Sequence, residues 1–357
     1  MVNPTTFVFV EPKTKEMNPI IKVGLLGTGR WGPNLIGSLK RISQVEITHI
    51  ADRNKQALDN VAKRFPGLVA HQNPKNIIEK ADLDAVVIST PVETHLELVE
   101  QSLKAGKHVF VEKPFGKSVE KCEKLCELAE FQKLHILVGH VFLFNASILA
   151  LKEIIASKEL GQILHIEAHR TNLGPVRKDV NAVWDLTSHD LSIFDFLLDS
   201  SPESVSCIGS SKLDASIADT SYTTFAYPNK VLAHAHASWL NPRKTRQITV
   251  IGEKKMALWD DINLEHPITI FDSSIGLDQS YYSDSFSSHR LSYNRGAVVL
   301  PAIKTNEPLF EEMKHFVNVI RGKEKNKCSG EYATKIVKAL VAADESLLNE
   351  SRLIEIK

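Results

Sequence analysis

Two clusters of ionisable residues in this chain have types and spacings that suit proton transfer. In the first, Lys113 stands between Glu112 and Pro114, directly after an apolar run. Proline restricts the residue before it to extended geometry, which fixes where the Lys113 stem points. In the second, Asp185 and His189 are four residues apart and share one face if a helix covers both. A carboxylate that holds an imidazole in one tautomer is a common way to position a proton-transfer group.

Each cluster also has an ordinary structural interpretation. Lys113 could be a surface lysine in a turn. Asp185 or Ser188 could cap a helix in which His189 is merely buried. Neither cluster alone distinguishes a proton-transfer site from these structural roles. The distinction depends on the strands and helices that would position the two clusters.

A glycine-rich turn supplies the most specific of these elements. Gly27-Thr28-Gly29-Arg30-Trp31-Gly32 lies between an apolar run at 20–26 and a helical pattern at 34–40, and Asp52 ends the next apolar run, twenty residues after Gly32. Such glycines let the backbone approach a pyrophosphate at a helix N-terminus, and the later carboxylate accepts from ribose hydroxyls. The pattern predicts a dinucleotide site rather than a tight turn without a ligand. Asp52 favours NAD because its charge repels a 2′-phosphate, while Arg53 leaves NADP open.

The order of the remaining patterns predicts the fold class. Strand and helix patterns alternate up to about residue 140, which indicates a doubly wound parallel sheet, whereas period-two runs dominate beyond residue 159 and indicate a mostly antiparallel sheet. In the first part the strands are expected at 45–50, 85–89, 108–111 and 135–138, and the helices at 55–64, 76–80, 94–105 and 119–132. In the second part the strands are expected at 163–171, 204–210, 221–227, 231–240, 247–251, 256–260 and 268–271, with helices at 188–198, 308–320 and 332–349.

These patterns predict an α/β protein with two domains. We expect a loosely ordered extension at 1–19, a Rossmann dinucleotide-binding domain at 20–141 and an α+β domain at 142–357. Residues 273–298 lack a clear period, and we expect a loop there, over the site or at a subunit contact. In a doubly wound sheet the ligand lies beyond the carboxyl ends of the strands, where the glycine turn and the segments 89–95 and 111–116 should meet.

Composition excludes several classes of partner. Lys+Arg and Asp+Glu both number 43, so no electrostatic footprint for nucleic acid or an anionic membrane is present, and no apolar run approaches the roughly 20 residues that span a bilayer. Cys122 and Cys126 lie one helical turn apart among leucines, which suits reduced thiols on a helix face and a cytoplasmic protein. His234 and His236 alternate on a strand, and two side chains rarely complete a metal site, so we expect no metal.

The motifs together resemble a known family. The glycine turn, the run Ala105-Gly106-Lys107-His108-Val109-Phe110-Val111-Glu112-Lys113-Pro114 and the Asp185–His189 pair are similar to the glucose–fructose oxidoreductase, inositol dehydrogenase and MocA family, from about residue 20 to the C-terminus. The resemblance implies an oxidoreductase whose second domain has a large open sheet that often builds the oligomer, here a homodimer or homotetramer. It also implies a cis bond before Pro114 and catalytic roles for Lys113, Asp185 and His189. The cofactor contacts that it implies are Gly27, Gly29, Thr90, Pro91 and Glu112. The full set of expected cofactor contacts also contains Thr28, Arg30, Trp31, Asp52, Arg53, His95 and Lys113.

A shorter stretch indicates the substrate. Residues 172–181, leading into Trp184, look closest to family members that oxidise the 3-hydroxyl of a nucleotide-linked sugar such as UDP-N-acetylglucosamine, or reduce the matching 3-keto sugar. Arg177 could grip a phosphate or carboxylate there, or be a solvated loop charge. The alternatives are an inositol or free-sugar dehydrogenase, a 3-ketosugar reductase, and a nucleotide-binding sensor without turnover. The expected substrate contacts are Lys113, Asn145, Arg177, Trp184, Asp185 and His189.

Two residues compete for the proton that leaves a secondary alcohol while nicotinamide takes the hydride. A lysine amine titrates near ~10.4, so Lys113 needs a lowered pKa, and Glu112 would oppose that shift if it were ionised and close. An imidazole titrates near ~6.5 and needs little tuning. We therefore favour His189 as the acid/base, with Lys113 hydrogen-bonded to the reacting oxygen and Asp185 orienting whichever acts. Lys113 as the base remains the alternative.

Overall fold

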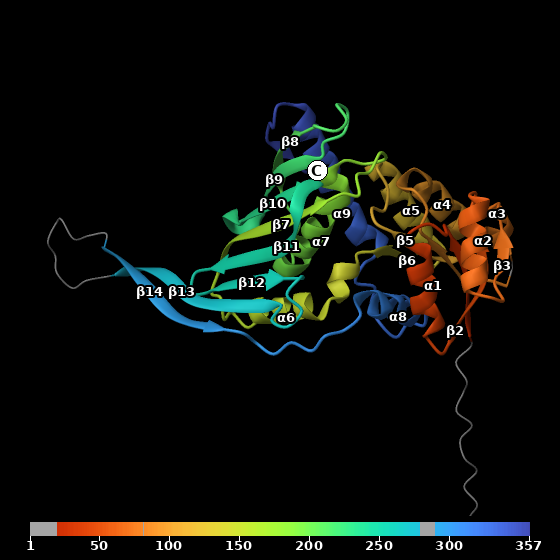
Figure 1. The fold of residues 1–357 in the computed structure, drawn as a ribbon, viewed down its shortest axis with the longest axis horizontal. Helices are drawn as coiled ribbons and strands as arrows, with labels where there is room; N and C mark the ends of the chain where they lie inside the picture. Colours follow the sequence, from red (N-terminus) through yellow and green to blue (C-terminus); the bar gives the residue numbers. More distant parts are fainter. Residues whose placement is uncertain (1–19, 81, 279–289) are drawn as a thin grey trace, which may run out of the picture.

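The computed structural model describes residues 20–80, 82–278 and 290–357. Two sheets organise them, one in each half of the chain (Figure 1). The extension expected at 1–19 lies outside the described residues. Among the helices that the structure describes, none has the length and apolar character to cross a bilayer.

The first sheet has six parallel strands in the order β3-β2-β1-β4-β5-β6, which confirms the doubly wound prediction. All four residues of β4 are buried, because helices cover both faces of such a sheet. The order reverses between β1 and β4, and this switch point is where doubly wound sheets bind ligands. The elements are β1 (Ile21–Leu26), α1 (Gly32–Lys40), β2 (Val45–Ala51), α2 (Lys55–Arg64), β3 (Val69–His71), α3 (Lys75–Ile78), β4 (Ala85–Ile88), η1 (Val92–Thr94), α4 (His95–Lys104), β5 (His108–Glu112), α5 (Val119–Phe131) and β6 (Ile136–Gly139).

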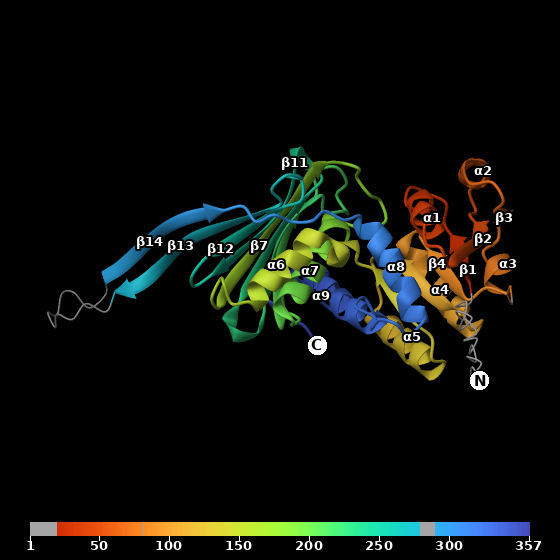
Figure 2. The ribbon, with the colours of Figure 1, turned by 90° about the horizontal axis from the view of Figure 1, so that it is seen from below.

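The second sheet has nine strands in the order β14-β13-β12-β11-β7-β10-β9-β8-β15. Its neighbouring strands are antiparallel except for β7 and β10, so the mostly antiparallel prediction is confirmed. Figure 2 shows α6, α7 and α9 along one face of this sheet. The elements are η2 (Val141–Phe144), α6 (Ala146–Ala156), β7 (Ile163–Leu173), η3 (Val183–Thr187), α7 (Ser188–Leu198), β8 (Ser204–Ser210), β9 (Thr220–Ala226), η4 (Pro228–Lys230), β10 (Leu232–Ser238), β11 (Leu240–Gly252), β12 (Met256–Asp260), β13 (Ile268–Asp278), β14 (Arg290–Val299), α8 (Pro308–Ile320), α9 (Gly330–Leu348) and β15 (Ile354–Glu355).

The structure corrects two expectations about local elements. A loop was expected at 273–298, of which 279–289 lie outside the described residues. On either side of that segment, β13 and β14 pair as an antiparallel ribbon that extends the sheet away from the first domain (Figure 1). Residues 294–299 are all exposed, and a strand without a buried face shows no period-two pattern. The sequence patterns also missed α6, whose start is capped by the Asn145 side chain, which accepts from the backbone of Ser147 and Ile148.

The last two long helices return to the first domain. Phe316 of α8 packs edge-on against Phe110 of β5, with ring centroids 5.8 Å apart. Thr334 of α9 lies 3.7 Å from the Cys126 sulfur on α5. The N-terminal sheet is therefore covered on both faces, partly by residues from the far end of the chain, and the ends of β5 and β6 become deeply buried.

Candidate active site

The glycine turn leaves its backbone open to a ligand. Gly27 has a positive φ of 96°, and a Cβ there would lie 2.6 Å from the Ser89 carbonyl group. A Cβ at Gly32 would lie 2.4 Å from the Gly27 oxygen, so only glycine allows α1 to start this close to the turn. Around Gly29 no atom lies within 4 Å of an added Cβ, which leaves space for a phosphate. The cradle fits a pyrophosphate at the start of α1.

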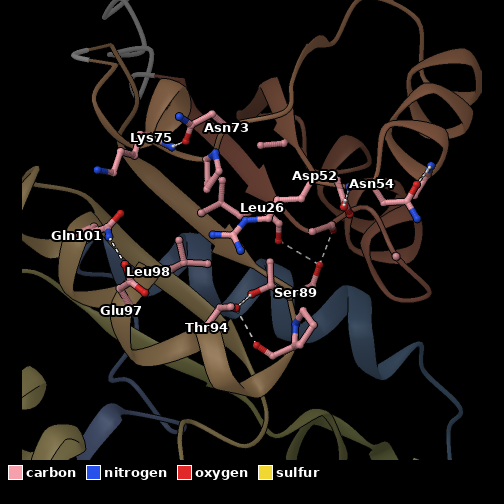
Figure 3. Close-up of a pocket in the computed structure, with 18 residues that line it drawn as sticks. Leu26, Asp52, Asn54, Asn73, Lys75, Ser89, Thr94, Glu97, Leu98 and Gln101 are labelled. Carbon is pink, nitrogen blue, oxygen red and sulfur yellow. Dashed lines mark hydrogen bonds between the residues drawn. The ribbon is translucent and has the colours of Figure 1, made fainter. Parts of the chain in front are cut away.

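A cavity of about 480 Å³ lies beside this turn, at the carboxyl ends of β1, β2 and β4. In Figure 3, Asp52, Asn73, Lys75, Ser89 and Gln101 surround the same hollow. The side chains and backbone are mostly uncharged, as expected for a pocket that holds an adenosine. The cofactor residues expected from the sequence that line the cavity are Gly27, Gly29, Asp52, Arg53, Thr90 and Pro91.

Asp52 has a structural role besides its expected contact with ribose. Its Oδ2 accepts from the Thr28 backbone at 2.7 Å and from the Thr28 hydroxyl at 3.0 Å. Its Oδ1 accepts from the Asn54 backbone at 2.8 Å. The carboxylate thus fixes the glycine turn at the edge of the cavity. Oδ1 accepts only one of these bonds and keeps a second lone pair that can accept from a ligand.

Four other expected cofactor residues have different surroundings. Thr28 is buried and its hydroxyl donates a hydrogen bond to Asp52, whereas Arg30 is exposed beside the turn. The Trp31 indole donates a hydrogen bond to Glu112, which links the glycine turn to β5. His95 is only 1% exposed, and its ring nitrogens contact the carbonyl oxygens of Thr90 and Pro114. The ring ties these two loops together, and the expected His95–cofactor contact stays a prediction.

Lys113 meets Asp185 where the two domains touch. Lys113 follows the last residue of β5, and Asp185 lies in η3, a turn of π-helix before α7. The ammonium nitrogen donates to the Asp185 backbone carbonyl at 2.7 Å and lies 3.4 Å from its carboxylate. The Lys113–Pro114 peptide bond is cis, as the resemblance implies. An amine that is 10% exposed is thereby held in one position.

Two further side chains hold the Asp185 carboxylate. Arg177 lies 3.3 Å from one oxygen, and the buried Trp239 indole donates to the other at 3.2 Å. Burial alone would raise the pKa of Asp185, but Lys113, Arg177 and the Trp239 hydrogen bond lower it below the usual value. Asp185 is therefore a stable carboxylate that is suited to position a cation rather than to exchange protons.

The proton affinity of Lys113 is reduced by its surroundings. Burial lowers its pKa most, Asp185 opposes this shift, and Arg177 adds to it. Burial also raises the pKa of the neighbouring Glu112 to about 7, even though Lys113 lowers it. The opposition expected from an ionised Glu112 is therefore weaker at neutral pH, and Lys113 gains the lowered pKa that a basic amine needs.

His189 does not contact Asp185 as the spacing predicted. Its Nδ1 is buried and has no hydrogen-bond partner among the described residues, while the Asp185 oxygens face Lys113, Arg177 and Trp239. The four-residue spacing brings side chains together only in an α-helix. Residues 183–187 form a π-helical turn, in which each residue rotates less about the axis, so the two side chains diverge.

Cationic groups surround His189 instead. Its ring packs edge-on against Phe142, with centroids 5.1 Å apart. Arg170 and Arg246 stand over the same Phe142 ring at 4.6 Å and 5.4 Å. Burial, Lys113 and these two arginines lower the pKa of His189 well below 6.5. The lowered pKa makes the neutral imidazole a weak proton acceptor, which favours a hydrogen-bonding role over that of a base.

Two residues that are expected to contact substrate have polar groups bonded within the fold. The Asn145 side chain caps α6 and also donates to Asp261 at 3.3 Å. Trp184 is 4% exposed, and its indole donates to Asp344 of α9. Both polar groups have partners within the fold, and the expected contacts of Asn145 and Trp184 with a sugar stay predictions.

Arg177 is half-buried rather than solvated. Its guanidinium contacts both oxygens of Asp179 and one oxygen of Asp185. These contacts use three of the five N–H donors of an arginine, and two remain for a ligand. The expected grip on a phosphate or carboxylate stays a prediction.

Several residues of this site gave no signal in the sequence. Trp239, Phe142, Arg170 and Arg246 occur in ordinary strand or turn patterns. The register of β7 with β11 brings Arg170 and Arg246 together, whereas Phe142 comes from η2 and Trp239 from the connection between β10 and β11. Nowhere in the described ranges do three His, Cys, Asp or Glu side chains gather as metal ligands. His236 stacks on Tyr222 with centroids 4.4 Å apart, on the sheet face without helices.

Replacing Gly27 tests whether the glycine turn at Gly27–Gly32 binds the cofactor. In Gly27→Ala, the new Cβ must move the Ser89 carbonyl or distort a backbone with positive φ, so we expect the dissociation constant for NAD⁺ to rise at least about tenfold. Gly37→Ala is the control, because its Cβ meets nothing within 4 Å in α1 and alanine favours a helix. Calorimetric titration measures both. Unchanged affinity in Gly27→Ala would contradict the proposed cradle.

Comparison with known proteins agrees with this arrangement. Residues 21–140 match the model of an oxidoreductase family with an NAD-binding Rossmann fold, and residues 148–258 match the GFO/IDH/MocA C-terminal domain. Inositol 2-dehydrogenase of Rhizobium meliloti is 28% identical over 204 residues, which cover 56% of this chain and 61% of that protein, less than two thirds of its length. UDP-N-acetylglucosamine 3-dehydrogenase of Acidithiobacillus ferrooxidans is 26% identical over 249 residues, 68% of this chain and 75% of that protein.

Solved structures share the whole fold. GenD2 from gentamicin A biosynthesis, in complex with NAD, superposes with a TM-score of 0.80 at 17% identity, over 98% of this chain and 100% of the other. The Acidithiobacillus ferrooxidans enzyme superposes with a TM-score of 0.76 at 21% identity, over 93% and 99% of the two chains. Since the two family models together match more than half of the sequence, the chain belongs to the GFO/IDH/MocA family of NAD-dependent oxidoreductases.

Proposed function

We propose that this protein oxidises a secondary hydroxyl of a sugar, with Lys113 as the proton-transfer residue. The observation that carries the proposal is the Lys113 ammonium held by Asp185, at 2.7 Å and 3.4 Å, just beyond the end of β5. The site lies at the carboxyl edge of the sheet, where the cofactor binds in this fold. A pure nucleotide sensor has no need for an amine held in this way, and this argues against a sensor without turnover.

The proposed reaction divides the work among three residues. Bound nicotinamide supplies hydride chemistry. Lys113 in its neutral form accepts the hydroxyl proton, and burial favours that form. Neutral His189 donates or accepts one hydrogen bond at the reacting oxygen, since its nearby cations disfavour an imidazolium. Asp185 orients Lys113. This assignment exchanges the roles that the sequence favoured for Lys113 and His189.

For the substrate we propose the 3-hydroxyl of a nucleotide-linked sugar such as UDP-N-acetylglucosamine. The relative from Acidithiobacillus ferrooxidans has that activity by name, and the segment 172–181 supports the same class. Two N–H donors of Arg177 remain for a phosphate. The inositol dehydrogenase relative keeps a free polyol as the alternative. Reduction of a 3-keto sugar uses the same groups in reverse.

We also propose that the protein is a cytoplasmic homodimer or homotetramer. Tyr222, Leu232 and Ile208 are 45–59% exposed on the face of the second sheet that α6, α7 and α9 do not cover. A second copy of this face is a suitable cover for them. All four cysteines are free and buried, which suits a reducing compartment.

A substrate panel tests the proposed class. With NAD⁺ present, UDP-N-acetylglucosamine should raise the absorbance of reduced nicotinamide, while myo-inositol and free N-acetylglucosamine should not. UDP should compete with the sugar nucleotide, because the proposed site binds the diphosphate. Turnover of inositol without inhibition by UDP would instead support the polyol alternative. A lack of signal with every sugar, in both directions of the reaction, would favour the sensor.

Substitution of the two proton-transfer candidates tests the mechanism. We expect Lys113→Ala to lower kcat by at least about 100-fold, the usual contribution of a general acid or base, with a smaller loss in His189→Ala. Lys121→Ala is the control, because Lys121 is an exposed lysine on α5. Steady-state kinetics should be paired with NAD⁺ titrations to separate turnover from cofactor binding. Near-normal kcat in Lys113→Ala would refute the proposed base.

A further inference from the structure

A buried pair of carboxyl groups lies behind Lys113, and the mechanism above does not use it. Glu112 ends β5 and is 6% exposed, and Glu312 of α8 is completely buried. Both oxygens of Glu312 lack a hydrogen-bond partner among the described residues. A buried carboxyl without partners is costly when it is charged, and each such group in a native fold calls for an explanation.

The pair can hold only one negative charge near neutral pH. Burial raises the pKa of Glu312 well above its usual value, and the nearby Glu112 adds to the shift. Two carboxyl groups in one dry site repel each other when both are ionised. Glu312 therefore keeps its proton, and Glu112 is the member of the pair that titrates, with a pKa of about 7.

The other titratable groups around the pair leave Glu112 as the group that titrates near neutral pH. Lys113 favours the ionised form of Glu112, as do the hydrogen bonds from its backbone and from Trp31. The Cys328 thiol near Glu312 is protonated, since burial and Glu312 raise its pKa. His140 lies close to Lys113, and burial lowers its pKa to about 3, so the imidazole adds no charge. Glu112 is thus the one group of this set whose charge changes near neutral pH.

Glu112 stands where a change in cofactor charge would be felt. It is the last residue of β5, directly before Lys113, and its bond from Trp31 joins it to the glycine turn. The ring of NAD⁺ carries a positive charge, and the ring of NADH does not. A positive charge nearby favours a carboxylate, and its loss favours the acid.

We propose that Glu112 binds a proton when the bound cofactor is reduced and releases it when the cofactor is oxidised, with Glu312 limiting the pair to a single charge. In the oxidative direction the substrate carbon gives a hydride to nicotinamide, and its hydroxyl gives a proton to Lys113. Transfer of that proton to the Glu112 carboxylate regenerates the amine and leaves Glu112 as the acid. This redox step rests on the proposed function, whereas the linkage between protonation and cofactor binding does not.

The linkage predicts how the two cofactor affinities depend on pH. Glu112 should be ionised at lower pH in the NAD⁺ complex than in the NADH complex. Between these two midpoints NADH binding takes up a proton relative to NAD⁺ binding, so the ratio Kd(NADH)/Kd(NAD⁺) rises with pH. We expect a rise of about tenfold from pH 5.5 to 8.5 if the midpoints differ by one unit, with constant ratios at both extremes.

The full-length protein with NAD⁺ or NADH alone is sufficient for the test. NADH fluorescence and calorimetry give the two dissociation constants, and calorimetry in buffers of different ionisation enthalpy counts the protons. Glu112→Gln should make the ratio independent of pH. Glu311→Gln should behave as the wild type, because Glu311 is partly exposed on the same helix and faces Lys314. Glu312→Gln should keep the pH dependence at about the wild-type midpoint, because an amide, like the protonated carboxyl that it replaces, carries no charge.

A pH-dependent ratio that persists in Glu112→Gln would overturn the assignment of the proton to Glu112. If that variant does not fold, equal proton uptake on binding NAD⁺ and NADH in the wild type would overturn it as well. Loss of the pH dependence in Glu312→Gln would show that Glu312 holds the titrating proton, and would refute the roles assigned within the pair. A different sugar substrate would change none of these outcomes, so failure here is distinct from failure of the proposed function.

Discussion

The contact between Lys113 and Asp185 is the constraint on which the rest of the site depends. It joins the end of β5 in the first domain to a π-helical turn in the second. An amine that is 10% exposed is costly to bury as an isolated cation. Asp185 compensates that cost and fixes the position of the amine. Because the two residues come from different domains, the same contact fixes both the relative placement of the domains and the geometry of the active site.

Charge balance around this contact sets the character of each group. Arg177 and Trp239 keep Asp185 ionised, which frees it from proton exchange. Burial and Lys113, together with Arg170 and Arg246, lower the pKa of His189 and keep the imidazole neutral. Arg170 is itself buried and paired with Asp190 at 2.7 Å. The lysine is therefore the group whose proton affinity is adjusted for transfer, and the histidine is the group whose charge is suppressed.

The sequence predicted the secondary-structure elements around this site well. The glycine turn, the doubly wound sheet and the position of Lys113 after β5 follow from local patterns, because a strand end and a proline constrain their neighbours directly. The convergence of Lys113 with Asp185 came from the family resemblance rather than from spacing. Asp52 was placed correctly at the cavity, although its bonds to Thr28 were not foreseen.

What the sequence could not give depends on long-range register and local helix geometry. The Asp185–His189 contact failed because the intervening turn is π-helical. His95, Asn145 and Trp184 were expected to meet ligands, yet their polar groups are used by backbone carbonyls, a helix start and Asp344 respectively. A short polar motif does not show whether its side chain points into a cavity or satisfies the fold.

Other members of the site came from distant strands. Trp239 reaches Asp185 because β10 and β11 are neighbours of β7 in the sheet, and no pattern within the sequence fixes that order. Glu312 lies two hundred residues after Glu112 in the chain, and only the return of α8 to the first domain brings them together. Such contacts are properties of the assembled fold.

Direct titration of Lys113 is the sharpest test of the central claim. Heteronuclear NMR of the protein with labelled lysine side chains follows each amine, and Lys113→Arg assigns its signal. The Lys113 pKa should lie clearly below the 10.5 of an ordinary lysine, and it should fall further in Asp185→Asn, because that carboxylate raises it. A Lys113 amine that titrates with the exposed lysines, and does not respond to loss of Asp185, would contradict the account.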